Sequence, residues 1–182
     1  MMSRLPTIQP ELATGQTKQL LQGVQKKLGF APNVMRTMAN SPAVLQAYLN
    51  FSQALGKGDL SPKLREQIAL VVAQDNQCEY CLAAHSAIGR TVGLSEEAIR
   101  DSRKGESPDT KDAAILEFAS ALVVNRGWVT DAELCTLRKA GVTDAEIAEI
   151  IANVALTIFT NYFNHVAQTK IDFPEVEELA VA

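Results

Sequence analysis

The amino-acid sequence predicts an all-α protein with about nine helices. Apolar residues recur along the chain at spacings of three and four, which is the period of an amphipathic helix. No run alternates apolar and polar residues for long, as a half-buried strand would, and the β-branched residues are scattered within the helical pattern. Capping residues mark many of the helix starts. Together these observations favour a helical bundle.

Five expected helix starts place a Ser or Thr before a Pro or before acidic residues. Such a hydroxyl can accept a hydrogen bond from the first helical turn, and Pro fits the first helical position. Thr130-Asp-Ala-Glu133 and Thr143-Asp-Ala-Glu146 also have the spacing of a capping box, in which the cap and the third helical residue bond each other reciprocally. The other three starts are Ser41-Pro42, Ser61-Pro62 and Ser95-Glu96-Glu97.

The breaks between the expected helices follow from glycines, prolines and polar runs. Gly29-Phe-Ala-Pro-Asn33 predicts a tight turn after the first helix, and Gly56-Lys-Gly58 ends the third. The polar run 103–110 separates the sixth helix from the seventh. The expected helices are 15–28, 33–39, 42–55, 62–75, 77–91, 96–103, 110–126, 131–139 and 144–168.

The composition is that of a globular chain that folds without a disulfide framework. With 182 residues, 47% of them hydrophobic, it can bury a core as one domain over 1–182, with 1–60 as an N-terminal helical extension packed on a core at 61–170. A net charge of -4 without a basic run argues against nucleic acid or an anionic membrane as partner. The sequence has no signal-peptide or membrane-spanning pattern, so we expect a cytoplasmic protein.

The run Cys78-Glu-Tyr-Cys81-Leu-Ala-Ala-His85 carries the chemistry of this sequence. Two cysteines three positions apart in a helix have Cα atoms about 5 Å apart, which suits a disulfide that opens and closes. His85 follows Cys81 by one helical turn, and an adjacent imidazole or a helix N-terminus lowers the pKa of a thiol from about 8.5. The run therefore predicts an activated thiolate and a resolving thiol. In a reducing compartment such a pair serves catalysis, redox sensing or metal binding.

Two further residues require an interpretation. Glu66 shares its helix face with small apolar residues, so its carboxylate is expected at a packed interface, where it could shuttle a proton to or from a thiol. An equally ranked alternative is a surface ion pair with Lys63, one turn back. We interpret the third cysteine, Cys135, as a buried free thiol that packs as a small hydrophobic side chain.

Glu66, then eleven residues, then Cys78-x-x-Cys81, then three residues and His85, resembles the active-site signature of the alkylhydroperoxidase AhpD-like branch of the carboxymuconolactone decarboxylase superfamily. Small residues around His85, in Ala83-Ala-His-Ser86, belong to the same pattern. Outside it, the segments 28–34, 41–45 and 161–174 are similar to a subgroup described as peroxidase-related proteins. The resemblance thus covers most of the chain.

This resemblance implies an AhpD-like helical bundle that assembles as a homo-oligomer, a trimer or a hexamer, and a thiol-dependent peroxidase that reduces hydroperoxides. By similarity, Cys81 would be the peroxidatic residue, Cys78 the resolving one, and Glu66 with His85 the proton relay. No bound cofactor or metal is implied. An external dithiol, from a reductant protein or a lipoyl-type donor, would have to reduce the pair.

Two physical effects disagree about which cysteine attacks. In Cys-x-x-Cys helices of the thioredoxin type the first cysteine lies nearer the positive helix end, which favours Cys78, whereas the position of His85 favours Cys81. We take Cys81 as the hypothesis. Tyr80 stands where some family members have a relay histidine, and a phenol is not a base near neutral pH. A disulfide reductase or redox sensor with little peroxidase activity is therefore the alternative.

Other classes of protein fit the sequence less well. Muconolactone decarboxylation is disfavoured because members with that activity are not expected to keep the cysteine pair. A structural zinc site needs four ligands and the motif offers three, while covalent haem would require a histidine where Leu82 stands. A non-enzymatic oligomeric binding protein with incidental thiols also competes. We interpret His165, in a long apolar helix, as a structural histidine, with a catalytic role as the alternative.

Overall fold

A computed structural model describes residues 3–177 and 179 of the chain; the remaining positions of the predicted domain 1–182 lie outside the described residues. The described part is built from helices, with no strand, which confirms the predicted all-α class. No helix in it is both long enough and apolar enough for a membrane crossing. In chain order the helices are α1 (Gly15–Leu28), α2 (Asn33–Met38), α3 (Pro42–Leu55), α4 (Pro62–Asp75), α5 (Glu79–Thr91), α6 (Glu96–Arg103), α7 (Thr110–Val124), α8 (Asp131–Lys139) and α9 (Asp144–Ala167).

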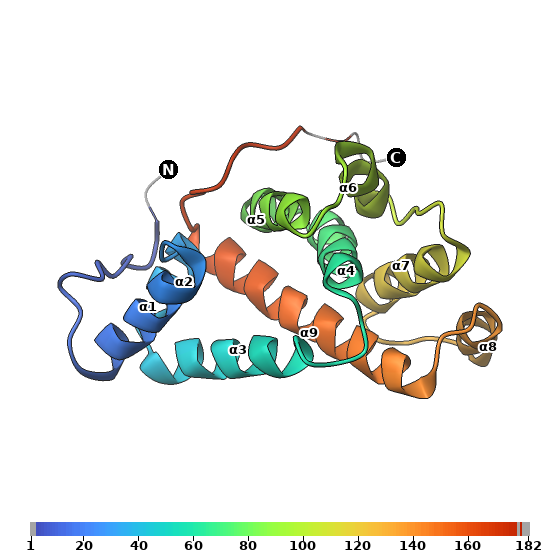
Figure 1. Cartoon of the computed structure of the whole chain (residues 1–182), viewed down its shortest axis with the longest axis horizontal. Helices are drawn as coiled ribbons and strands as arrows, with labels where there is room; N and C mark the ends of the chain where they lie inside the picture. Colours follow the sequence, from blue (N-terminus) through green and yellow to red (C-terminus); the bar gives the residue numbers. More distant parts are fainter. Residues whose placement is uncertain (1–2, 178, 180–182) are drawn as a thin grey trace.

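The longest helix, α9, runs through the middle of the molecule, and the other helices pack around it and around α4 (Figure 1). Helices α1, α2 and α3 lie at one end of α9, while α7 and α8 lie at the other (Figure 1). Helix α4 packs against α5, α6, α7 and α9. Because α4 and α9 contribute side chains to both of the core clusters described below, they connect the two.

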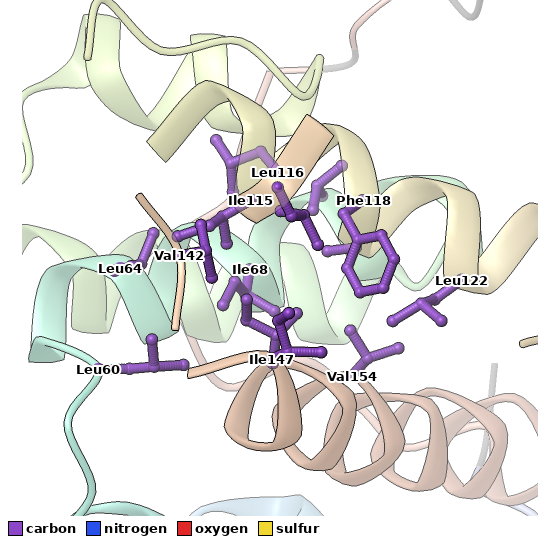
Figure 2. Close-up of a cluster of buried hydrophobic side chains, with 14 of the residues drawn as sticks. Leu60, Leu64, Ile68, Ile115, Leu116, Phe118, Leu122, Val142, Ile147 and Val154 are labelled. Atoms are coloured by element: carbon purple, nitrogen blue, oxygen red, sulfur yellow. The ribbon is translucent and has the colours of Figure 1, made fainter. Parts of the chain in front are cut away.

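The first core cluster fills the space between α4, α7, α8 and α9. Figure 2 shows Ile115 and Phe118 of α7 above Ile147 and Val154 of α9, with Ile68 of α4 between them. Burying a large apolar side chain of this kind contributes about 1.5–3 kcal/mol to stability. The buried members of the cluster are Leu60, Leu64, Ile68, Val71, Val72, Ile115, Leu116, Phe118, Ala119, Leu122, Leu137, Val142, Ile147, Ile150 and Val154.

The second core cluster surrounds the Cys-x-x-Cys run. It joins the inner faces of α1, α2 and α3 to the end of α4 and the start of α5. The N-terminal helices therefore form much of the wall around the two cysteines. Its buried members are Ala13, Leu21, Val34, Met38, Ala39, Leu45, Ala73, Cys78, Tyr80, Cys81, Leu82 and Ala84.

Most of the predicted caps form as hydrogen bonds. The Ser61 and Ser95 hydroxyls accept from the first turns of α4 and α6, and Thr130 and Thr143 form complete capping boxes. The prediction for Ser41 is wrong in one respect, since its hydroxyl accepts no hydrogen bond from the described residues of α3. Helix α3 instead starts with a proline at its first position, whose fixed φ already suits a helix.

The segment after α9, residues 168–177, is called the tail here. It leaves the end of α9 and passes over α5 toward α6 (Figure 1). The Asn33 N–H at the start of α2 donates to Asp172 Oδ2 at 2.7 Å, and the Asn33 side-chain amide donates to the Lys170 carbonyl at 3.0 Å. Farther on, Arg103 Nη1 donates to the Glu177 carbonyl at 2.8 Å. The tail thus ties α2, α5 and α6 together across the face that carries the cysteines.

Candidate functional site

Cys78 and Cys81 form a disulfide at the start of α5, with Cα atoms 5.2 Å apart. The sequence predicted both cysteines inside one helix, but Cys78 is the N-cap residue and has an extended backbone. The chain turns at Gln77, which has a φ of 55°, and the Cys78 N–H donates back to the Ala73 carbonyl at 2.9 Å. Cys81 therefore occupies the third helical position, within the turn whose unpaired N–H groups make the positive end of the helix.

The disulfide is almost completely buried, and its environment includes a residue that the sequence analysis did not predict. Cys78 is 1% exposed and Cys81 is 2% exposed. The Asn164 amide of α9 donates from Nδ2 to Cys81 Sγ at 3.4 Å. Asn161, one turn earlier, accepts a hydrogen bond from Asn76 Nδ2 at 2.9 Å. Two asparagines at helical spacing on the buried side of an apolar helix were the signal available in the sequence.

His85 and Glu66 form a hydrogen-bonded pair between α5 and α4. Nδ1 of His85 lies 2.8 Å from Oε2 of Glu66, and the two side chains are 23% and 17% exposed. The structure thus favours the packed-interface prediction for Glu66 over an ion pair with Lys63. Because a carboxylate only accepts, the imidazole donates from Nδ1, which leaves Nε2 free to exchange a proton. The pair can therefore take up and deliver a proton at Nε2.

The pair opens into a cavity of about 450 Å³ between α1, α3, α4, α5 and α9, called the His85 cavity here. Its wall combines apolar side chains such as Leu49 with many polar and charged ones, such as Arg65. Burial, with the Glu66 carboxylate nearby, raises the pKa of Tyr48 to about 12, so its phenol stays a neutral donor. Neither cysteine lines this cavity.

A second cavity, of about 480 Å³, adjoins Cys78 and is called the Cys78 cavity here. Cys78, Asn164, His165 and Thr169 contribute to its wall, and it shares no lining residue with the His85 cavity. His165 thus lines the same cavity as the first cysteine and not the cavity of the Glu66 pair. The last turn of α9 and the first residues of the tail bring these side chains to Cys78.

Tyr80 lines the Cys78 cavity, but its hydroxyl is engaged in the fold. The phenol oxygen accepts from the Val34 N–H at 3.1 Å and donates to Asp172 Oδ1 at 2.7 Å. Burial raises the pKa of Tyr80 far above its ordinary value of 10.0. Its ring also meets that of Phe173 edge to face, with centroids 5.7 Å apart. Tyr80 therefore connects α2, α5 and the tail as a neutral structural group.

Cys135 is exposed on α8, so the prediction of a buried thiol is wrong. Helix α8 is short, and Leu137 is its one residue counted as buried. The face that carries Leu137 turns inward, which directs Cys135 to solvent.

Within residues 3–177, no three His, Cys, Asp or Glu side chains come together as ligands of a metal ion.

Known proteins resemble this chain in both sequence and fold. The carboxymuconolactone decarboxylase family profile matches residues 42–123, which include Glu66, both cysteines of the pair and His85. No curated protein is a significant match. A peroxidase-related protein with an alkylhydroperoxidase AhpD core from Ralstonia eutropha JMP134 is 28% identical, with a TM-score of 0.83 over 94% of this chain and 93% of that one.

Two further solved structures share the fold. A peroxidase-related protein from Silicibacter sp. TM1040 is 27% identical, with a TM-score of 0.81 over 92% of this chain and 89% of that one. The debrominase Bmp8, bound to 2,3,4-tribromopyrrole, is 20% identical, with a TM-score of 0.80 over 94% and 93% of the two chains. The helical architecture, the matched region and these likenesses agree: residues 42–123, with the Cys-x-x-Cys pair, match the carboxymuconolactone decarboxylase family, and the fold is AhpD-like.

Proposed function

We propose that this protein is a thiol-dependent peroxidase that reduces hydroperoxides through Cys78 and Cys81. One observation supports the proposal most directly: a buried disulfide lies one helical turn from the hydrogen-bonded His85–Glu66 pair. A redox-active dithiol and a proton donor are the two components that reductive cleavage of an O–O bond requires. The names of the two peroxidase-related neighbours agree with this function.

The oxidative half-reaction starts from the reduced pair. The Cys81 thiolate attacks the terminal oxygen of the hydroperoxide, the O–O bond breaks, and a sulfenic acid forms on Cys81. His85 Nε2, which has taken the proton of the Cys81 thiol, delivers that proton to the leaving alkoxide, which departs as alcohol, while Glu66 holds the imidazole in place. The Cys78 thiol then attacks the sulfenic sulfur, water leaves and the disulfide forms. The hydroperoxide takes up two electrons, and the two thiols lose them.

Three features support Cys81 as the attacking residue. It lies in the first turn of α5, where the helix end stabilises negative charge. It accepts a hydrogen bond from Asn164, which strengthens when the sulfur carries a charge. His85 follows it by one turn. Of these three features, Cys78 has only its position at the positive end of the helix, where it is the N-cap residue.

The hydroperoxide enters through the His85 cavity in this mechanism. That cavity contains the proton donor, and its volume of about 450 Å³ and the apolar part of its wall, with Leu49, leave room for the organic group of a hydroperoxide. Tyr48 offers a neutral donor to the bound peroxide. Cys81 does not line the cavity while the disulfide is closed, so reduction must first free its side chain to turn toward His85.

A disulfide reductase or redox sensor is the second candidate, and Tyr80 is the observation that favours it. The hydroxyl of Tyr80 is committed to Val34 and Asp172, so this residue supplies no second relay beside the cysteines. Proton delivery then depends on His85 and Glu66 alone. Slow turnover with peroxide and fast exchange with disulfides would distinguish this candidate.

A thiol count tests the proposal on a Cys135→Ser background, which leaves only the pair. We expect one equivalent of cumene hydroperoxide to remove two thiols together and to release one equivalent of alcohol. Cys81→Ser should abolish both effects, and Cys78→Ser should leave a sulfenic acid that a dimedone probe traps. If neither thiol reacts, the peroxidase proposal is wrong. If the adduct appears only when Cys81 is absent, the roles of the two cysteines are exchanged.

Two predictions about partners remain open. The pair needs an external dithiol to return to the reduced state. We also expect the chain to form a homo-oligomer, a trimer or a hexamer, which light scattering coupled to size-exclusion chromatography measures directly. A mass of 19.7 kDa in solution, that of one chain, would contradict the second prediction.

A further inference from the structure

We propose that the Cys78 cavity is the entry site for the reductant, a slender dithiol that attacks Cys78 from a cavity that shares no lining residue with the His85 cavity. This inference rests on the proposed function, because it supplies the reductive half of the same cycle. Under it, oxidant and reductant reach the two sulfur atoms by separate routes. His165, which the peroxidase step does not use, becomes the base of the reductive step.

Access to the sulfur atoms supports this route. Cys78 lines the Cys78 cavity, whereas neither cysteine lines the His85 cavity. A cavity of about 480 Å³ is large enough for a small molecule. Because Cys78 is only 1% exposed, a thiol fixed on the flat surface of a folded protein cannot approach it, but a narrow, flexible dithiol can.

The wall of the Cys78 cavity also contains two polar atoms without partners. Asn164 Oδ1 and Thr169 Oγ1 are buried and make no hydrogen bond with any described residue. The two residues are 5% and 8% exposed, and both line the cavity. Folded proteins rarely leave such groups unpaired, since each costs about 1–3 kcal/mol. A guest with S–H and hydroxyl groups can satisfy both atoms, because Asn164 Oδ1 accepts and the Thr169 hydroxyl does either.

The chemistry is a balanced thiol–disulfide exchange. His165 takes the proton of the first reductant thiol, and the resulting thiolate attacks Cys78 Sγ. The Cys78–Cys81 bond breaks, and Cys81 leaves as a thiolate held by the Asn164 amide at 3.4 Å. The second reductant thiol then loses its proton and attacks the reductant's own sulfur in the mixed disulfide, and Cys78 leaves as a thiolate that takes up that proton. The dithiol loses two electrons and becomes a disulfide, and both cysteines end reduced.

The test measures the two half-reactions separately, on a Cys135→Ser background. The reductive half is the rate at which thiols appear when dithiothreitol is added to the oxidised protein, followed by acid quench, alkylation and mass spectrometry. The oxidative half is the rate at which one equivalent of cumene hydroperoxide removes thiols from the reduced protein. Exposed residues at the two cavity rims provide a matched pair of blocking variants, Glu79→Trp at the Cys78 cavity and Gln53→Trp at the His85 cavity.

We expect Glu79→Trp to slow reduction by about tenfold or more, which is a barrier increase of about 1.4 kcal/mol, and to leave oxidation within about twofold. Gln53→Trp should slow oxidation by a similar factor and leave reduction within about twofold. Glu79→Gln, which removes the charge without adding bulk, should leave both rates near those of the parent. His165→Gln should slow reduction alone. Reduced thioredoxin, whose dithiol sits on a folded surface, should react more slowly than dithiothreitol at equal concentration.

Thr169→Val separates a binding role from a structural one. Valine keeps the shape and removes the unpaired hydroxyl, so the free energy of unfolding should stay equal or increase, while reduction by dithiothreitol slows. A loss of stability with an unchanged rate of reduction would assign the hydroxyl to the fold instead.

The reductant route is wrong if Gln53→Trp slows reduction while Glu79→Trp does not, or if thioredoxin reacts faster than dithiothreitol. A failure of the peroxidase proposal would look different. Cumene hydroperoxide would then remove no thiols from the reduced parent protein, while the rim variants would still change the rate at which dithiothreitol reduces the disulfide. The two failures are therefore distinguishable in the same set of measurements.

Discussion

Asn164 is the residue of the long helix α9 that forms a hydrogen bond with the disulfide. Its amide donates to Cys81 Sγ at 3.4 Å, and a donor of this kind stabilises a thiolate more than a disulfide sulfur. It therefore favours the reduced state of the pair. Its position also explains why the sequence motif alone does not describe the site, because 83 residues separate it from Cys81.

We predict that Asn164→Ala lowers the reduction potential of the pair. Loss of a hydrogen bond worth about 1–2 kcal/mol to the thiolate makes the potential about 20–40 mV more negative. Equilibration in dithiothreitol redox buffers, followed by alkylation and mass spectrometry, measures the change. Asn161→Ala is the matched control, since Asn161 is buried on the same helix but bonds Asn76, so it should alter stability and not the potential. An equal shift in both variants would contradict the prediction.

We predict that Tyr80→Phe acts on stability and not on the cysteines. The change leaves the buried Val34 N–H without its acceptor and Asp172 without its donor, which costs about 1–3 kcal/mol. Urea unfolding of the oxidised protein measures the loss. Tyr162→Phe is the control, because Tyr162 is 58% exposed and its substitution should change little. A large loss of peroxide reactivity in stable Tyr80→Phe protein would instead give the phenol a chemical role.

At the scale of elements, helix α9 starts with a capping box, and the glutamate of that box also forms an ion pair with Lys111. Glu146 accepts from the Thr143 N–H at 2.8 Å and from Lys111 Nζ at 2.7 Å. Lys111 first, and then the Thr143 N–H, lower the pKa of the Glu146 carboxyl below its usual value of 4.5. The first turn of the central helix is thereby joined to α7.

The lowered pKa predicts how this helix start responds to acid. Because the folded pKa lies below the unfolded one, the stabilisation is complete above pH 4.5 and is lost as the pH falls through the folded pKa. Glu146→Gln should cost about 1 kcal/mol at neutral pH, with a difference from the parent that shrinks in acid. Urea unfolding between pH 3 and pH 7 measures it.

Glu133→Gln in the capping box of α8 is the comparison for this test. Glu133 accepts hydrogen bonds from Thr130 but from no lysine, so its substitution should lower the free energy of unfolding by less than Glu146→Gln does. An equal effect at both sites would mean that Lys111 adds nothing to the start of α9.

Local sequence signals were sufficient for most helix bounds, although α2, α7 and α9 end one or two residues before the expected position and α5 starts two residues after it. Caps and glycines depend on neighbouring residues, so the expected bounds of α1, α3, α4, α6 and α8 agree with the structure. The start of α5 moved to Glu79 because Gln77 adopts a positive φ, which few non-glycine residues do and which no nearby residue announces. The error matters for function, since it changes Cys78 from a helical residue to a cap.

At the scale of the whole molecule, α4 and α9 belong to both core clusters, so we predict a single cooperative unfolding transition. Leu45→Ala in the second cluster and Ile115→Ala in the first each remove a side chain that is 0% exposed, at a cost of about 2–5 kcal/mol. Each should shift one common midpoint by circular dichroism and calorimetry. If Leu45→Ala unfolds the N-terminal helices in a separate step, the two clusters are independent domains.

The candidate site shows the same division between local and distant information. Helix spacing indicated Cys78, Cys81 and His85 as one group, and the resemblance to the family signature added Glu66 from the preceding helix. The two cavities depend on α1, α3, the end of α9 and the tail, whose approach is a matter of tertiary packing. Cys135 was misjudged for a related reason, since the period of a short helix does not determine which face turns inward.

The exposed thiol of Cys135 has a practical consequence. In the oxidised protein the other two cysteines are joined and buried, so a maleimide should label this one position under native conditions. Helix α8 lies at the end of the molecule away from α5 (Figure 1), and a dye attached there should leave the redox pair undisturbed. The natural sequence therefore already contains a unique attachment point for fluorescence or surface-immobilisation experiments, and one from which copies can cross-link in air.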